Sequence, residues 1–103
     1  RVSKKKKIEE CLFGTGGKSD INFNLITRKS GSAALDMAYV GSGRYDGYFQ
    51  KNLNIWDIAA GIIIVKEAGG KINDIQYSDD KEIKILAGSN SIYDKMLEKL
   101  INF

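Results

Sequence analysis

The sequence predicts an α/β domain in which helices pack against a partly parallel sheet. Predicted strands alternate with predicted helices along the 103 residues, a pattern typical of layered α/β folds. The run 58–65 is apolar on every side of a helix, so we expect that helix to be buried all round, as a helix between layers would be. The chain has the length of one domain.

The N-terminal third contains two predicted strands. Residues 8–13 form the first, and the loop Gly14-Thr15-Gly16-Gly17 ends it. That loop lacks the Lys-Ser/Thr ending of a P-loop, so we do not expect it to cradle phosphate in that way. A polar segment, 18–24, leads to a second short strand at 25–29.

A helix and an aromatic-rich strand follow. Ser32 is a favourable N-cap residue, and Gly41 and Gly43 end the helix. Between them, apolar residues recur at helical spacing: Leu35, Ala38 and Tyr39. Residues 44–50 predict a strand. Its aromatic side chains are expected in the core rather than on a surface for stacking nucleic-acid bases: Tyr45, Tyr48 and Phe49.

The most informative stretch is 54–70, which contains the only tryptophan. Trp56 is followed by Asp57, which we expect to cap the helix start. Gly69 or Gly70 is expected to take the left-handed conformation that ends helices. A carboxylate at the positive end of a buried helix suits a site for phosphate or a metal ion.

The C-terminal third predicts two strands and a helix. The strands are expected at 71–75 and 83–87, joined by a polar turn at 76–81. Ser91 is expected to begin the last helix, with Asp94 as its capping-box partner. One face of this helix carries the apolar residues Ile92, Met96, Leu97, Leu100 and Ile101.

Composition excludes several classes of chemistry. The chain has no histidine, so imidazole catalysis is excluded, and its one cysteine, Cys11, cannot form an internal disulfide and is expected as a buried filler. The net charge of +3 does not by itself establish nucleic-acid binding. The segment Arg1–Lys7, which ends in four lysines, predicts a solvated turn between strands, with a polyanion-binding arm as the alternative. With no membrane-spanning stretch or signal peptide visible, we expect no membrane partner and a cytoplasmic location.

Four segments of the chain carry a recognisable pattern: Gly31–Val40, Gly43–Phe49, Trp56–Gly61 and Glu67–Gly70. Together they resemble the C-terminal half of the inositol monophosphatase family, in particular its bacterial extragenic-suppressor branch. The resemblance implies a layered αβα sandwich, the C-terminal half-domain of the inositol monophosphatase/sugar phosphatase fold, with a mixed, partly parallel sheet. We therefore expect 1–103 to form a single C-terminal phosphatase subdomain, with the N-terminal metal-binding half absent.

The resemblance also implies a function, that of a Mg²⁺-dependent phosphomonoesterase of the inositol-1-monophosphatase type. Such enzymes remove phosphate from small sugar or polyol phosphates with a metal-activated water. Asp57 corresponds to the catalytic aspartate that ligates magnesium, and Gly31, Ser32 and Ala33 correspond to the helix start that binds substrate. Gln50 stands at the substrate-binding position where the family usually has glutamate. Glutamine keeps one acceptor there and loses the charge.

Two departures from the family limit this expectation. The metal-binding motif Asp-Pro-Ile-Asp-Gly-Thr does not occur, and the chain contains no proline. A single carboxylate cannot assemble a two-metal centre, so we expect the isolated chain to be inactive. The remaining aspartates are expected as surface, turn and cap residues: Asp20, Asp36, Asp46, Asp74, Asp79 and Asp80. The segment between Gly17 and Thr27 is also shorter than the helix the family carries there.

Two alternatives to an enzyme portion stay open. The chain could be a non-catalytic remnant or interaction module that self-associates through surfaces the missing half would cover, and a homo-oligomer is then expected. A weaker alternative is an RNA-associated module that uses the basic residues Lys4–Lys7, Arg28 and Lys29.

Overall fold

The computed structural model describes residues 1–16, 24–75, 83–101 and 103. In chain order the elements are η1 (Ile8–Glu10), β1 (Leu12–Thr15), β2 (Ile26–Arg28), α1 (Ala33–Gly41), β3 (Gly47–Leu53), α2 (Ile55–Glu67), β4 (Lys71–Ile72), β5 (Ile83–Gly88) and α3 (Tyr93–Lys99). The described strands form one five-stranded sheet in the order β2-β1-β3-β5-β4. β1 is parallel to β2 and β3, and β5 is antiparallel to β3 and β4. The predicted mixed, partly parallel sheet is confirmed.

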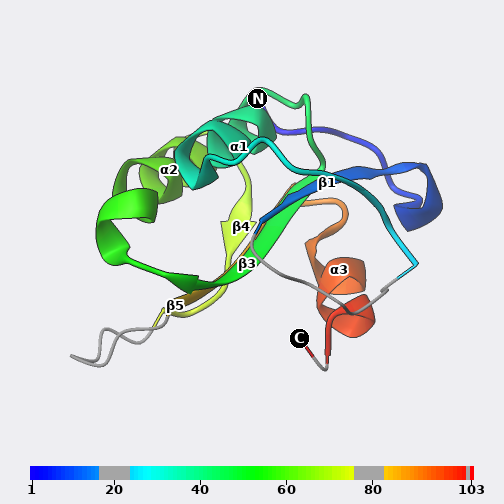
Figure 1. The fold of residues 1–103 in the computed structure, drawn as a ribbon. Helices are drawn as coiled ribbons and strands as arrows, with labels where there is room; N and C mark the ends of the chain where they lie inside the picture. Colours follow the sequence, from blue (N-terminus) through cyan, green and yellow to red (C-terminus); the bar gives the residue numbers. More distant parts are fainter. Residues whose placement is uncertain (17–23, 76–82, 102) are drawn as a thin grey trace.

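Helices cover both faces of this sheet. α1 and α2 lie side by side on one face, and α3 lies on the other (Figure 1). Neighbouring strand residues divide between the two layers because successive side chains point to opposite faces. Tyr48 packs with the α1 and α2 residues, whereas Phe49 packs with those of α3. The layered αβα arrangement is therefore confirmed.

α1 and α2 approach each other closely at two glycines. A Cβ on Gly61 would lie 2.7 Å from Sδ and 2.8 Å from Cβ of Met37. A Cβ on Gly41 would lie 2.7 Å from Cγ2 of Ile64. This close packing holds the N-terminal ends of both helices beside the same part of β3.

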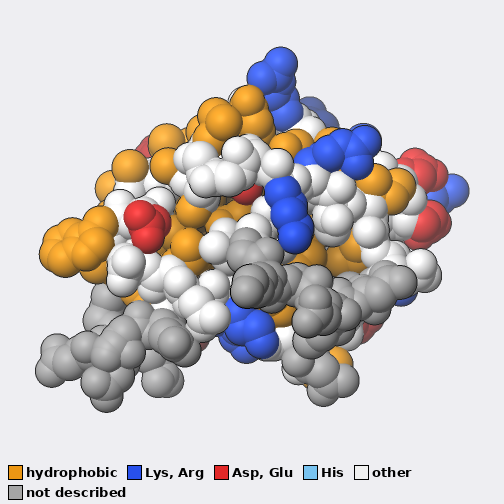
Figure 2. Space-filling view, in the orientation of Figure 1, with side chains coloured by type: hydrophobic (Ala, Val, Ile, Leu, Met, Phe, Trp, Pro, Cys, Tyr) orange, Lys and Arg blue, Asp and Glu red, His pale blue; other side chains and the backbone are white. Residues whose placement is uncertain are grey.

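The expectation that α2 is buried all round is wrong. Only Ile58, Gly61 and Val65 of this helix are buried. Trp56 is 85% exposed and Ile63 is 63% exposed. The physical reason is that α2 packs against α1 and the sheet with one side, and nothing among the described residues covers its outer side. Figure 2 shows hydrophobic side chains gathered over this helical layer.

The first and third strands are displaced from their predicted positions. Residues 8–10 form the short helix η1, and β1 begins at Leu12 and includes Gly14 and Thr15. Gly14 does not end the strand; it makes room for the Tyr45 ring, since a Cβ there would lie 2.9 Å from two ring carbons. β3 begins at Gly47 rather than at 44, because the backbone N–H groups of Arg44 and Tyr45 still bond the Tyr39 carbonyl in the turn that follows α1.

The predicted start of α1 and the predicted end of α2 are confirmed, whereas the predicted start of α3 is wrong. Ser32 caps α1, with its Oγ accepting the Leu35 N–H at 3.1 Å, and Gly69 has φ +93° after α2. The expected Ser91–Asp94 capping box is wrong: α3 has Ile92 as its N-cap residue, with no side-chain cap bond. The buried face of this helix holds Ile92, Met96 and Leu100, whereas Leu97 and Ile101 are exposed.

Two other predictions on this part of the chain have mixed outcomes. The strand expected at 71–75 is shorter, since β4 spans only Lys71–Ile72. The turn expected at 76–81 lies outside the described residues. Cys11 is buried in the core, as predicted. No helix in the described part of the chain is both long enough and apolar enough to cross a membrane.

Candidate active site

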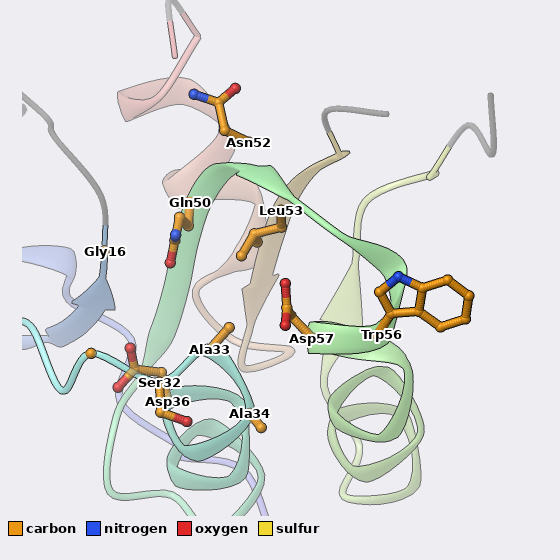
Figure 3. Close-up of a pocket in the computed structure, with 11 residues that line it drawn as sticks. Gly16, Ser32, Ala33, Ala34, Asp36, Gln50, Asn52, Leu53, Trp56 and Asp57 are labelled. Atoms are coloured by element: carbon orange, nitrogen blue, oxygen red, sulfur yellow. The ribbon is translucent and has the colours of Figure 1, made fainter. Parts of the chain in front are cut away.

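A pocket of about 540 Å³ opens where the N-terminal ends of α1 and α2 meet β3 (Figure 3). It lies beyond the end of β1 and beside the second half of β3, two parallel strands. The carboxyl ends of parallel strands are where α/β folds commonly bind ligands. The pocket is lined by Gly16, Gly31, Ser32, Ala33, Ala34, Asp36, Gln50, Asn52, Leu53, Trp56 and Asp57. The structure thus brings all of the predicted site residues to one place.

A bulge in β3 brings the start of α2 to this pocket. The register with β5 changes from Gln50 opposite Ile85 to Leu53 opposite Ile83, which leaves one extra residue on β3. Asn52 accommodates it with φ +65°, a left-handed conformation that asparagine tolerates. The strand bends at this point, and Figure 3 shows the chain turning over the pocket into α2.

Asp57 lies in the first turn of α2. The prediction that it is the N-cap of this helix is wrong. The N-cap is Asn54, and Asp57 is the third helical residue, whose Oδ2 accepts the Asn54 backbone N–H at 3.2 Å. This bond fixes the carboxylate against the helix start. Figure 3 shows the carboxylate facing the space between α1 and β3, while the Trp56 indole points away from it.

The start of α1 forms the second wall of the pocket. Gly31 has φ +85°, and Ser30 Oγ accepts the Ser32 backbone N–H at 3.0 Å. These contacts turn the chain sharply into the helix, whose first backbone N–H groups then face outward. The N-terminal end of a helix carries a partial positive charge and suits an anion such as phosphate.

Asp36 was expected at the surface, and that prediction is wrong. Its side chain is 1% exposed, and Oδ1 is buried with no hydrogen-bond partner among the described residues. Burial raises the pKa of its carboxyl, and a bond with the Ser30 side chain opposes this shift. Asp36 shares the buried face of α1 with Val40, four residues on, and this spacing was the signal that sequence reasoning missed.

Asp46 is also buried rather than exposed, and its role is structural. Its Oδ2 accepts the Leu12 backbone N–H at 2.7 Å and lies 3.6 Å from Lys5 Nζ. Asp46 thereby ties the turn before β3 to β1, away from the pocket. Asp74 is exposed, as expected. The others of that group, Asp20, Asp79 and Asp80, lie outside the described residues.

Gln50 reaches the pocket from the same face of β3 as Tyr48. The Tyr48 hydroxyl donates a hydrogen bond to Gln50 Oε1. Tyr48 is fully buried, and burial raises the pKa of its hydroxyl above the usual value. Residues two apart on a strand share a face, so this pair could have been predicted from the sequence.

The donor set of the pocket fits one ligand position of a magnesium site. Mg²⁺ prefers oxygen ligands and often retains several waters, and the Asp57 carboxylate is such a ligand. Within the described residues, no three histidine, cysteine, aspartate or glutamate side chains gather closely enough to hold a metal ion. Asp57 is therefore a candidate for one ligand of such an ion.

Comparison with known proteins places the chain in a family. The sequence model of the inositol monophosphatase family matches residues 1–102. A Thermotoga maritima protein named fructose-1,6-bisphosphatase/inositol-1-monophosphatase is 39% identical, over 99% of this chain and 44% of its own length. The Nus factor SuhB of Pseudomonas aeruginosa is 34% identical, over 94% of this chain and 43% of its own.

Solved structures agree in fold. The inositol monophosphatase of Anabaena superposes with a TM-score of 0.83 at 32% identity, covering 99% of this chain and 47% of that one. The extragenic suppressor protein suhB of Bartonella henselae superposes with a TM-score of 0.81 at 38% identity, covering 97% of this chain and 46% of that one. The chain spans less than half the length of these relatives. From the match over nearly all of its residues, we conclude that the chain belongs to the inositol monophosphatase family.

Proposed function

We propose that this chain is the C-terminal portion of a Mg²⁺-dependent phosphomonoesterase of the inositol-1-monophosphatase type. One observation carries the proposal: the Asp57 carboxylate and the N-terminal end of α1 line the same pocket. A metal ligand and an anion-binding helix end are the two features that hydrolysis of a phosphate ester requires from this half of a site. Relatives named as phosphatases of inositol phosphate and fructose bisphosphate support it.

Each wall of the pocket has its own part in this proposal. The backbone N–H groups at the start of α1, from Ala33 on, bind phosphate oxygens, while Gly31 and Ser32 form the turn that presents them to the substrate. Asp57 holds one coordination position of Mg²⁺, and its bond to Asn54 keeps the carboxylate oriented. Magnesium, when bound, activates the attacking water and neutralises charge on the leaving oxygen. Gln50, on β3, contacts the sugar or polyol portion of the substrate.

The remaining metal ligands come, in this proposal, from a segment corresponding to the N-terminal half of the longer relatives. The isolated chain is then inactive, since one carboxylate holds Mg²⁺ too weakly to position a water. To test this, the chain is mixed with the N-terminal segment of the Thermotoga maritima relative, and phosphate release from inositol 1-phosphate is measured with and without Mg²⁺.

We expect Mg²⁺-dependent release in the mixture and none from either part alone. Release by the isolated chain would contradict the division of the site between two segments. Failure of a mixture that forms a stable complex, shown by co-elution, would contradict the phosphatase proposal itself.

A second candidate function is supported by a separate observation. Trp56, Ile63 and Ile64 leave an apolar surface on α2 exposed, with fractions of 85%, 63% and 43%. Contiguous apolar surface of this kind marks association sites in proteins. We therefore keep a self-associating interaction module as the alternative, in which the same surface joins two copies of the chain.

A further inference from the structure

We infer that Gln50 presents hydrogen-bond donors to the ligand, so that the pocket selects phosphate esters whose other end carries a carboxylate over those that carry a hydroxyl there. The inference rests on the proposed function and names a substrate class for the same pocket. It follows from the contact between Tyr48 and Gln50 and from the packing of Gln50 against Gly16.

Tyr48 is the donor in its hydrogen bond with Gln50. The Tyr48 side chain has no exposed surface, and among the described residues its hydroxyl has no acceptor other than Gln50 Oε1. If the Gln50 amide were reversed, the hydroxyl would accept from Nε2 and its own hydrogen would stay buried and unpaired. An unpaired buried donor costs about 1–3 kcal/mol, so the hydroxyl donates and Oε1 accepts.

The side-chain amide of Gln50 has two polar atoms, Oε1 and Nε2, and their surroundings differ. Oε1 is engaged by Tyr48 and packs against Gly16, where an added Cβ would collide with it and with Cδ. Nε2 lies farther from that position, at 3.3 Å. Gln50 is half-buried and lines the pocket, so the Nε2 donors are the polar atoms it offers there. One lone pair of Oε1 accepts from Tyr48, and packing against Gly16 covers this oxygen, so its remaining acceptor capacity is turned away from the ligand.

The pocket has its anion-binding helix end and Asp57 on one side and the Gln50 amide on the other, with Asn52 beside it. A phosphate ester bound by the helix end turns its other end toward these amides. A carboxylate there accepts from Nε2 without an unused donor of its own. Hydrogen bonds to charged groups are stronger than those to neutral ones, so the carboxylate is preferred.

The test uses two ligands with the same carbon skeleton. 6-Phosphogluconate carries a carboxylate at the position where sorbitol 6-phosphate carries a hydroxymethyl group. Each is titrated with Mg²⁺ into a complex of the ¹⁵N-labelled chain with the unlabelled N-terminal segment of the Thermotoga maritima relative, and shifts of the Gln50 side-chain amide and the Ser32 backbone amide give the two dissociation constants. The variants are Tyr48→Phe, Gln50→Glu and Asn52→Asp, each checked for a dispersed native spectrum.

We expect the natural chain to bind 6-phosphogluconate about tenfold more tightly than sorbitol 6-phosphate, as one charged hydrogen bond provides. Tyr48→Phe frees the amide to turn, so the ratio falls toward one even if both affinities change. Gln50→Glu reverses the preference. Asn52→Asp adds the same charge to the same pocket and changes the ratio less, because Nε2 of Gln50 still donates.

Three results would overturn the inference. These are equal binding of both ligands by the natural chain, an unchanged ratio in Tyr48→Phe, and an Asn52→Asp effect as large as that of Gln50→Glu. In each of these cases the proposed phosphate site still stands, provided that both ligands shift the Ser32 backbone amide. If neither ligand nor inorganic phosphate shifts Ser32, the proposed function fails and the inference fails with it.

Discussion

Two buried carboxyl groups show how the same residue type serves different ends in this chain. Asp46 Oδ2 accepts the Leu12 N–H and lies near the Lys5 ammonium, although its Oδ1 is buried without a hydrogen-bond partner among the described residues. Asp36 has one oxygen without a partner among the described residues, and it faces the aromatic side chains of Tyr45 and Tyr48. A carboxylate pays a desolvation cost in such surroundings unless it is paired. Asp36 therefore destabilises the folded chain when it is ionised.

The stability of the folded chain is expected to depend on pH through Asp36. Burial raises the pKa of the Asp36 carboxyl in the folded chain above its usual value of 3.8. The protonated carboxyl therefore stabilises the folded chain at low pH. This stabilisation is lost as the pH rises from below 3.8 through the raised pKa. Asp36→Asn removes the ionisable group, so we expect the variant to be the more stable at pH 7, with the difference shrinking toward pH 4. Urea unfolding at several pH values measures this. A variant less stable than the natural chain at pH 7 would contradict it.

Among helices, the α1–α2 contact is the one that sets the pocket. Gly61 faces the Met37 side chain, and Gly41 faces the Ile64 side chain, so each glycine leaves the room that the opposite side chain fills. Their N-terminal ends, which carry Ser32 and Asp57, depend on this spacing for their separation across the pocket.

Gly61→Ala tests that contact. In an open helix this change stabilises by about 1 kcal/mol. Here the new methyl would meet the Met37 stem at 2.8 Å, and overpacking costs about 1–3 kcal/mol, so we expect a net loss of stability. Met37→Ala added to the variant should recover part of the overpacking cost, measured by a double-mutant cycle in thermal unfolding. A stabilised single variant would show that the helices have room to separate.

What could be predicted from the sequence differs between these elements for physical reasons. Ser32 and Gly69 were predictable because a cap depends on neighbouring backbone groups. The exposed side of α2 was not, since its apolar residues are the same whether another layer covers them or not. Residue type alone likewise did not show that Asp36 is buried, because burial depends on the sheet against which α1 packs. The grouping of the site residues followed from the family resemblance rather than from local pattern.

At the scale of the molecule, an exposed apolar surface on α2 lies next to the pocket. Trp56 belongs to both, because it adjoins Asp57 and also heads the exposed surface of α2. The lysine run lies elsewhere: Lys4–Lys7 are exposed on the N-terminal segment. An apolar surface beside a pocket is the arrangement expected where another segment or copy docks.

The open surface predicts self-association of the isolated chain. We expect light scattering at micromolar concentration to show a species larger than one chain, and Ile63→Lys to shift it toward a monomer, because the charge would be buried in the contact. Leu97→Lys, on the opposite helical layer and 38% exposed, is the matched control and should leave the mass unchanged. A sharp monomer for the natural chain would rule out this prediction.

The most direct test of the account compares Asp57→Asn with Asp94→Asn in the mixture with the Thermotoga maritima N-terminal segment. Asp57 lines the pocket, whereas Asp94 is exposed on α3, so the two variants lose the same charge at different places. The measurement is the Mg²⁺-dependent rate of phosphate release from inositol 1-phosphate. We expect a loss of roughly 100-fold or more for Asp57→Asn, as for removal of a group that stabilises the transition state, and no loss for Asp94→Asn. Equal rates for the two variants would contradict the assignment of Asp57 to the metal site.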